Sequence, residues 1–154
     1  MGNFTGSLLV EITERQTAGR TLAVTRGMLR YRGDVGEQSV DVMVPDAFET
    51  DFASVPRLFW WLVPPLGRYA KATVIHDYLY VTGELSRKLA DSVLYQAMLD
   101  LQVNVWLARV IHAAVRLWGF FYWRHCVNIG SSGRLDRFGG LAPVGIHAER
   151  GSKQ

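Results

Sequence analysis

Four polar side chains with the chemistry of a hydrolytic site lie near the middle of the sequence. His76 and Asp77 are adjacent in the apolar segment VIHDYLY, Tyr80 follows one helical turn after the histidine, and Asp91 lies further along. Charged side chains are rarely buried unless they are paired. A neutral histidine can act as a general base for water, and a carboxylate on its second ring nitrogen fixes the tautomer. The spacing therefore predicts a His-Asp site.

Two helices are expected to position these side chains. The first spans residues 69–82 and ends at Gly83, and the second spans 87–100, with Ser86 as its N-cap. Because the loop between them is short, the helices should pack antiparallel. Asp91 would then face the first helix, where it could orient the histidine, and the tyrosine hydroxyl could hold that carboxylate.

Asp77 is expected to have a different role from its neighbour. It is rotated by about 100° from His76 around the helix, so it points to other partners. A carboxylate in this position could ligate a hard cation such as Ca²⁺, which prefers oxygen ligands. The cation would polarise an ester carbonyl and stabilise its oxyanion.

The segments HDYLY and SRKLAD resemble the core of phospholipase A2. In that family a His-Asp-x-x-Tyr helix packs against an antiparallel helix that carries an aspartate, and the disulfide-free version in parvovirus capsid proteins is similar. The resemblance implies that His76 is the base, Asp91 its orienting carboxylate, Tyr80 the support of that carboxylate, and Asp77 the calcium ligand.

The sequence departs from phospholipase A2 upstream of the histidine. The superfamily has a glycine-rich calcium loop there, whereas this chain has PPLGRY. Asp51 and Ser54, in the segment TDFASVPR, are the candidates to replace that loop beside Asp77. The resemblance thus implies Ca²⁺ as a cofactor, and an enzyme that would be a calcium-dependent hydrolase.

A longer stretch, residues 50–98, resembles the family called domain of unknown function 1353. The resemblance rests on the segments TDFASVP, PPLGRYAKATVIHDYLY and SRKLADSVLYQAM. Members of that family are mostly phage and prophage proteins, so the resemblance implies a phage origin and assigns no activity. The residues that such members share correspond to Asp51, Ser54, His76, Asp77 and Asp91.

The expected fold is α+β, in a single domain that spans residues 1–154. Alternating apolar and polar residues predict strands at 6–12, 20–32 and 39–45. These strands would form a small N-terminal antiparallel β-sheet within a β-rich part, residues 1–50.

A helical part is expected at residues 51–123. A short helix at 56–62 and a third long helix at about 103–123 would accompany the His-Asp helix pair, and the three long helices would form a bundle. Residues 124–154 are rich in glycine and polar side chains, which predicts a loop-rich, extended C-terminal tail.

Basic residues gather toward the C-terminal end. Residues 101–154 contain 7 basic and 2 acidic side chains, and residues 1–100 contain 10 basic and 12 acidic ones. Arg109, His112 and Arg116 follow at i, i+3 and i+7 of the third helix, so they form a candidate phosphate-binding or partner-binding stripe. Two arginines disfavour a transmembrane span, which leaves a core helix with a basic stripe or an interfacial membrane helix.

Several other classes of protein are disfavoured by the sequence. The single cysteine, Cys126, excludes an internal disulfide, and the N-terminus lacks the pattern of a signal peptide. Metal-dependent HD phosphohydrolases need a histidine upstream of the His-Asp pair, and none precedes His76. His125 is adjacent to Cys126, and neighbouring side chains point apart in a strand, which disfavours a Cys-His hydrolase.

Three functions remain open from the sequence. The first is a phage-encoded, virion-associated tail or tail-tip protein that carries a phospholipase A2-like His-Asp site. The second is an active metal-dependent ester hydrolase that acts at the host membrane during entry or lysis. The third is a purely structural protein-protein interaction module. The expected partners are other virion or tail proteins and a phospholipid membrane rather than nucleic acid, and the expected location is the virion or the host cytoplasm.

Overall fold

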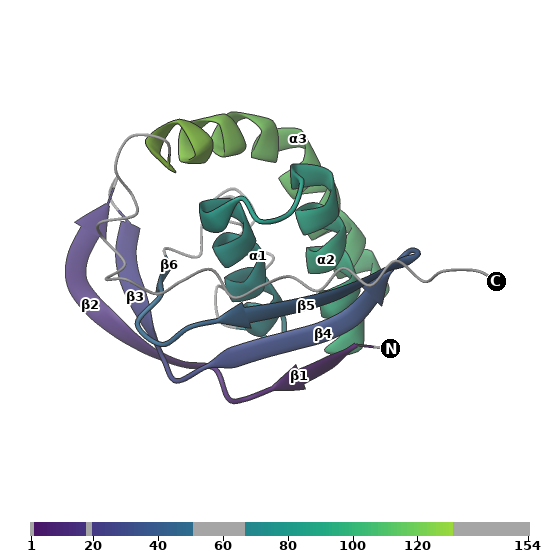
Figure 1. The fold of residues 1–154 in the computed structure, drawn as a ribbon, viewed down its shortest axis with the longest axis horizontal. Coiled ribbons are helices and arrows are strands. Elements are labelled where there is room, and N and C mark those ends of the chain that lie inside the picture. The colour runs from purple at the N-terminus through teal and green to yellow at the C-terminus, as the bar shows by residue number, and fades with distance from the viewer. Residues whose placement is uncertain (1, 18–19, 51–66, 131–154) are drawn as a thin grey trace.

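The computed structural model describes residues 2–17, 20–50 and 67–130 of the chain (Figure 1). The fold is α+β, as the sequence predicted: antiparallel strands come first and three long helices follow.

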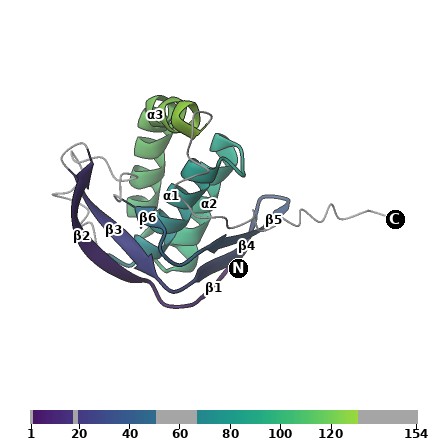
Figure 2. The same ribbon diagram turned by 60° about the vertical axis from the view of Figure 1, so that its left-hand side comes forward.

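Two three-stranded antiparallel sheets make up the N-terminal half. The first has the strand order β1-β4-β5, which are Asn3–Thr5, Leu29–Val35 and Gln38–Val44. The second has the order β2-β3-β6, which are Leu9–Thr17, Arg20–Arg26 and Glu49–Thr50. Figure 2 shows the strands curving around the helices. The prediction of one sheet was therefore too simple.

The predicted strand at 20–32 is interrupted at Gly27. This glycine has a φ of +84°, in the left-handed region that favours glycine, and its N–H donates a hydrogen bond to the Asp46 carboxylate at 2.7 Å. The chain leaves one sheet and enters the other at this turn. The prediction of a single continuous strand was wrong because this turn separates β3 from β4.

Helices α1 and α2 agree closely with the predicted pair. α1 spans Ala70–Thr82 and ends at Gly83, whose φ is +67°. α2 spans Arg87–Asp100, and the Ser86 hydroxyl accepts a hydrogen bond from the Leu89 N–H at 3.4 Å. The stop signal and the N-cap that the sequence predicted are both confirmed.

The third helix is longer than predicted. α3 spans Val105–Gly130, and the Asn104 side chain caps its first turn. Residues 124–130, which the sequence placed in the tail, are therefore helical. The predicted short helix at 56–62 and the rest of the tail, 131–154, lie outside the described residues.

The helices form layers over the first sheet. α1 and α2 pack against β4 and β5, and α3 packs against α1 and α2 (Figures 1 and 2). Side chains from these elements share one apolar core, whose most buried large members are Tyr31, Leu29, Ile75, Leu79, Leu94 and Met98. No helix in the described ranges is both long and apolar enough to cross a membrane.

Candidate functional site

A buried histidine and a buried aspartate face each other between α1 and α2. His76 Nε2 lies 3.1 Å from Asp91 Oδ1. The two side chains are 2% and 0% exposed. Buried charges are found almost only with a partner, and each of these groups supplies a partner to the other.

Tyr80 completes the contact from the same helix as the histidine. It lies one turn after His76, and the two rings are 4.1 Å apart between centroids. The Tyr80 hydroxyl donates a hydrogen bond of 2.5 Å to Asp91 Oδ1. The short connection at residues 83–86 makes α2 antiparallel to α1, which brings Asp91 opposite both side chains.

Arg87 lies beside the second carboxylate oxygen. Its Nη1 is 3.6 Å from Asp91 Oδ2 and also donates to the backbone carbonyl of Arg116 at 3.3 Å. Asp91 Oδ2 accepts no hydrogen bond from the part of the chain that the structure describes. Arg87 was not among the predicted site residues, although its i, i+4 spacing from Asp91 was a signal for this ion pair.

The surroundings of Asp91 favour its ionised form. Burial alone would raise the pKa of Asp91, but hydrogen bonds from His76 and Tyr80, together with the nearby charge of Arg87, outweigh burial and hold that pKa below its usual value. Burial, and then the hydrogen bond to Asp91, raise the pKa of the Tyr80 hydroxyl far above its usual value. The site therefore combines a carboxylate with a neutral phenol at neutral pH.

Asp77 is held by a residue of strand β6 and not by helix α2. The side chain is 7% exposed, and its Oδ2 accepts a hydrogen bond of 2.6 Å from the Thr50 hydroxyl. Thr50 reaches this position because β6 pairs with β3, with Thr50 opposite Ala23. No local sequence pattern pointed to Thr50, because this contact depends on a long-range strand pairing.

The described residues do not by themselves form a calcium site. Among them, no three histidine, cysteine or acidic side chains are grouped as metal ligands. Calcium takes six to eight oxygen ligands, and here Asp77 supplies one carboxylate. The other two predicted ligands, Asp51 and Ser54, lie outside the described residues.

The three members of the predicted basic stripe do not converge. Arg109 is exposed, with its guanidinium 5.4 Å from the centre of the Trp106 ring, and Arg116 is exposed as well. His112 instead packs against Tyr95 of α2, at 5.3 Å between ring centroids, and its buried Nε2 has no hydrogen-bond partner among the described residues. Burial lowers the pKa of His112. Two arginines thus face solvent, and the histidine faces the helix bundle.

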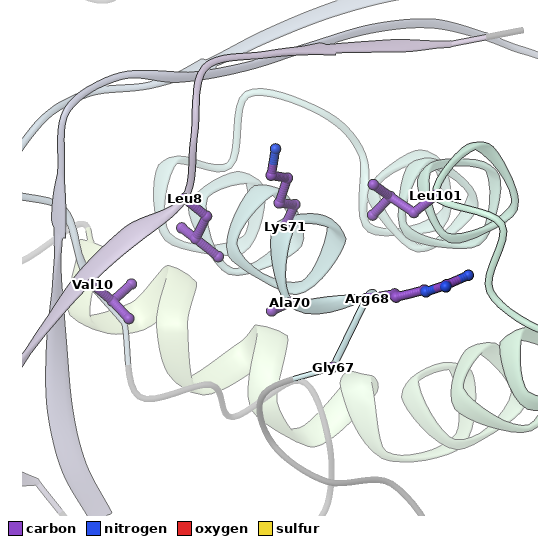
Figure 3. A pocket seen from close by; sticks show the side chains of 7 residues that line it. All are labelled: Leu8, Val10, Gly67, Arg68, Ala70, Lys71 and Leu101. Carbon is purple, nitrogen blue, oxygen red and sulfur yellow. The ribbon is translucent and has the colours of Figure 1, made fainter.

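A shallow pocket lies away from the His-Asp pair, at the start of α1 (Figure 3). Apolar side chains form most of its wall, and two cationic side chains lie at its edge. Its lining residues are Leu8, Val10, Gly67, Arg68, Ala70, Lys71 and Leu101. None of the predicted site residues that the structure describes lines this pocket.

Comparisons with known proteins identify one family that matches the middle of the chain, including the His-Asp pair. The family described as "Protein of unknown function (DUF1353)" matches residues 25–115, which include the His-Asp pair, Tyr80 and Thr50. The chain is 35% identical over 78 residues to "Uncharacterized protein y4jT" from Sinorhizobium fredii. That match covers 49% of this chain and 23% of the relative, so the chain spans less than a quarter of that protein. No solved structure matches the chain.

Proposed function

We propose that this chain, which belongs to the family of proteins of unknown function DUF1353, is an ester hydrolase of the phospholipase A2 type. The observation that carries the proposal is the buried chain of contacts from His76 to Asp91 and from Asp91 to Tyr80. The same three residue types make these contacts in the phospholipase A2 core that the sequence resembles. The proposed substrate is the carboxylic ester of a phospholipid.

The geometry supports a specific tautomer of His76. An ionised Asp91 accepts a hydrogen bond, so the ring nitrogen that faces it, Nε2, carries the proton. The lone pair of the neutral ring then lies on Nδ1. A neutral histidine with a fixed tautomer is suited to act as a general base.

The proposed reaction has two proton transfers. His76 Nδ1 takes a proton from water while the water oxygen bonds to the ester carbonyl carbon. When the tetrahedral intermediate collapses, the bond from carbon to the alcohol oxygen breaks, and His76 returns the proton to the leaving alkoxide. Asp91 stabilises the imidazolium that exists between the two steps, which is the role of the carboxylate in catalytic triads.

The proposed setting is a phage particle. The resemblance to phage and prophage proteins implies a virion-associated protein, for instance in the tail or tail tip, where its hydrolysis would act on the host membrane during entry or lysis. A calcium ion held by Asp77 with Asp51 and Ser54 would supply polarisation of the ester carbonyl.

A structural role is the second candidate, and one observation favours it. His76 and Asp91 are almost fully buried, as is Asp77. A buried, hydrogen-bonded polar network can serve to specify one packing of two helices without any chemistry. In that case the protein would act through its surfaces, as an interaction module within the virion.

Fatty-acid release from mixed phosphatidylcholine and phosphatidylglycerol vesicles separates the two candidates. The native protein is compared with H76Q and D91N, with calcium and with a chelator. We expect release by the native protein and a loss of at least about a hundredfold in both variants, because general-base catalysis contributes on that order.

A matched pair of tyrosine variants controls for damage to the fold. Tyr80 and Tyr69 are both buried, but among the described residues the Tyr69 hydroxyl has no hydrogen-bond partner, so Y69F should keep the native rate while Y80F lowers it. No release by a folded native protein under either metal condition would contradict the hydrolase and leave the structural role.

A further inference from the structure

The outward side of α3 carries exposed apolar side chains between two arginines. Trp106 and Leu117 are each 73% exposed and Val110 is 38% exposed. Their positions, with those of the neighbouring arginines, repeat at three and four residues and therefore share one face of the helix. We call this surface the α3 outer face and define it by Trp106, Arg109, Val110, Ala113, Arg116 and Leu117.

The charge of the α3 outer face is not compensated. In the described part of the chain, neither Arg109 nor Arg116 forms an ion pair, and α3 contains no acidic residue. Three arginines of the sheets behave differently, because carboxylates hold them: Arg26 pairs with Glu11, and Arg30 and Arg32 pair with Asp41. The α3 outer face is thus an apolar strip with free positive charge.

The cationic contact on this face also involves its largest apolar side chain. The Arg109 guanidinium lies over the Trp106 ring, 5.4 Å from its centre. Tryptophan and arginine are the side chains that occupy the boundary between lipid headgroups and acyl chains, where an aromatic ring and a cation both find partners. This arrangement matches an interfacial helix.

Other occupants fit less well. If a second copy of the chain docked through the same face, Arg109 and Arg116 of one copy would lie close to the same arginines of the other. The face has no carboxylate to offset the repulsion between these charges. A nucleic acid would use the arginines, but it would leave Val110 and Leu117 without a role, because phosphate contacts dominate such binding. An anionic bilayer uses both the charge and the apolar side chains.

We propose that the α3 outer face docks on membranes that contain anionic phospholipid, with Trp106 and Leu117 inserted at the headgroup boundary and Arg109 and Arg116 bound to lipid phosphates. The proposal rests on the proposed function only in that both involve a phospholipid bilayer. Docking does not require hydrolysis, so the two can fail separately.

Co-sedimentation with vesicles of ether-linked lipid tests the docking. Ether-linked phosphatidylcholine and phosphatidylglycerol contain no carboxylic ester, so hydrolysis cannot change the vesicles. The native chain should bind vesicles that contain phosphatidylglycerol and should not bind pure phosphatidylcholine. The double variant R109Q/R116Q should bind these vesicles at least about 10-fold more weakly, since each cation near an anionic surface contributes substantially to binding.

The apolar part of the face is tested by W106S/L117S, which should also lose binding. The matched control is L9S/I12S, which removes apolar side chains of similar exposure, 61% and 69%, from β2. For the charges, R32Q/R68Q lowers the net charge by the same amount at exposed positions outside α3. Both controls should bind within about twofold of the native chain.

Three results would overturn the proposal. The first is that the native chain fails to bind anionic vesicles. The second is that R109Q/R116Q binds these vesicles as tightly as R32Q/R68Q does. The third is that a short duplex DNA displaces the chain from vesicles through the same arginines, while W106S/L117S still binds the vesicles. The last result would assign the face to nucleic acid. If docking holds while ester hydrolysis is absent, the docking surface stands and the hydrolase is refuted.

Discussion

The Tyr80 hydroxyl donates a 2.5 Å hydrogen bond to Asp91 Oδ1, the same oxygen that faces His76 Nε2. The carboxylate that orients the histidine is therefore held by a side chain from the histidine's own helix. Both contacts cross from α1 to α2, so the alignment of the two helices and the orientation of the imidazole depend on the same few atoms.

Y80F should destabilise the protein by about 2 kcal/mol, because it removes a buried hydrogen bond to a charged group. Y69F should leave stability unchanged or slightly higher, since the buried Tyr69 hydroxyl has no hydrogen-bond partner in the part of the chain that the structure describes. Urea denaturation of the two variants beside the native protein measures the difference. Equal effects of the two substitutions would show that the hydrogen bond to Asp91 contributes nothing.

D91N should remove an acid-sensitive part of the stability. The folded-state pKa of Asp91 lies below the 3.8 of an ordinary aspartate, so its contribution is fully present above about pH 4 and is lost as the pH falls through the lower, folded value. We expect D91N to cost about 3 kcal/mol at neutral pH. The gap between D91N and the native protein should narrow below about pH 4. A gap that is constant from neutral to acidic pH would contradict the ionised state of Asp91.

The helix pair could be predicted from sequence because its signals are local. Gly83 stops one helix, Ser86 caps the next, and the short turn between them forces an antiparallel pair. Once the pair is antiparallel, the spacing from His76 to Asp91 is enough to place them face to face. The roles of these residues in chemistry remain predictions.

Other parts of the structure depend on contacts that local patterns do not encode. The pairing of β6 with β3 brings Thr50 to Asp77, and no short-range pattern predicts that pairing. The separation of β3 from β4 depends on a left-handed Gly27 bound by the distant Asp46. The inward position of His112 depends on how α3 rotates against α2.

R87Q should weaken the link between α2 and α3. Arg87 lies close to Asp91 and donates to the Arg116 carbonyl, so its loss should lower the free energy of unfolding by about 1 kcal/mol and raise the pKa of Asp91. K88Q is the matched control, because Lys88 is the exposed neighbour on the same helix. Chemical denaturation as a function of pH reports both effects. An R87Q profile that overlays the K88Q profile would contradict this role.

H112L should reduce the sensitivity of the protein to mild acid. Burial lowers the pKa of His112 below the ordinary 6.5, so the folded protein holds this ring neutral. That contribution is fully present above about pH 6.5 and is lost as the pH falls through the folded value. H112L cannot titrate, and it also removes a buried nitrogen that has no hydrogen-bond partner within residues 2–17, 20–50 and 67–130. Thermal melts between neutral pH and about pH 5 should show a smaller drop for H112L than for the native protein, and an equal drop would refute the assignment.

A measurement of the His76 tautomer is the sharpest test of the proposed general base. In ¹⁵N-labelled protein at about pH 8, the chemical shifts of the two ring nitrogens distinguish a protonated nitrogen from one with a lone pair. We expect a protonated Nε2, hydrogen bonded to Asp91, and an unprotonated Nδ1 that can accept a proton from water. A ring with Nδ1 protonated, either as the opposite tautomer or as an imidazolium paired permanently with Asp91, would contradict the general-base role.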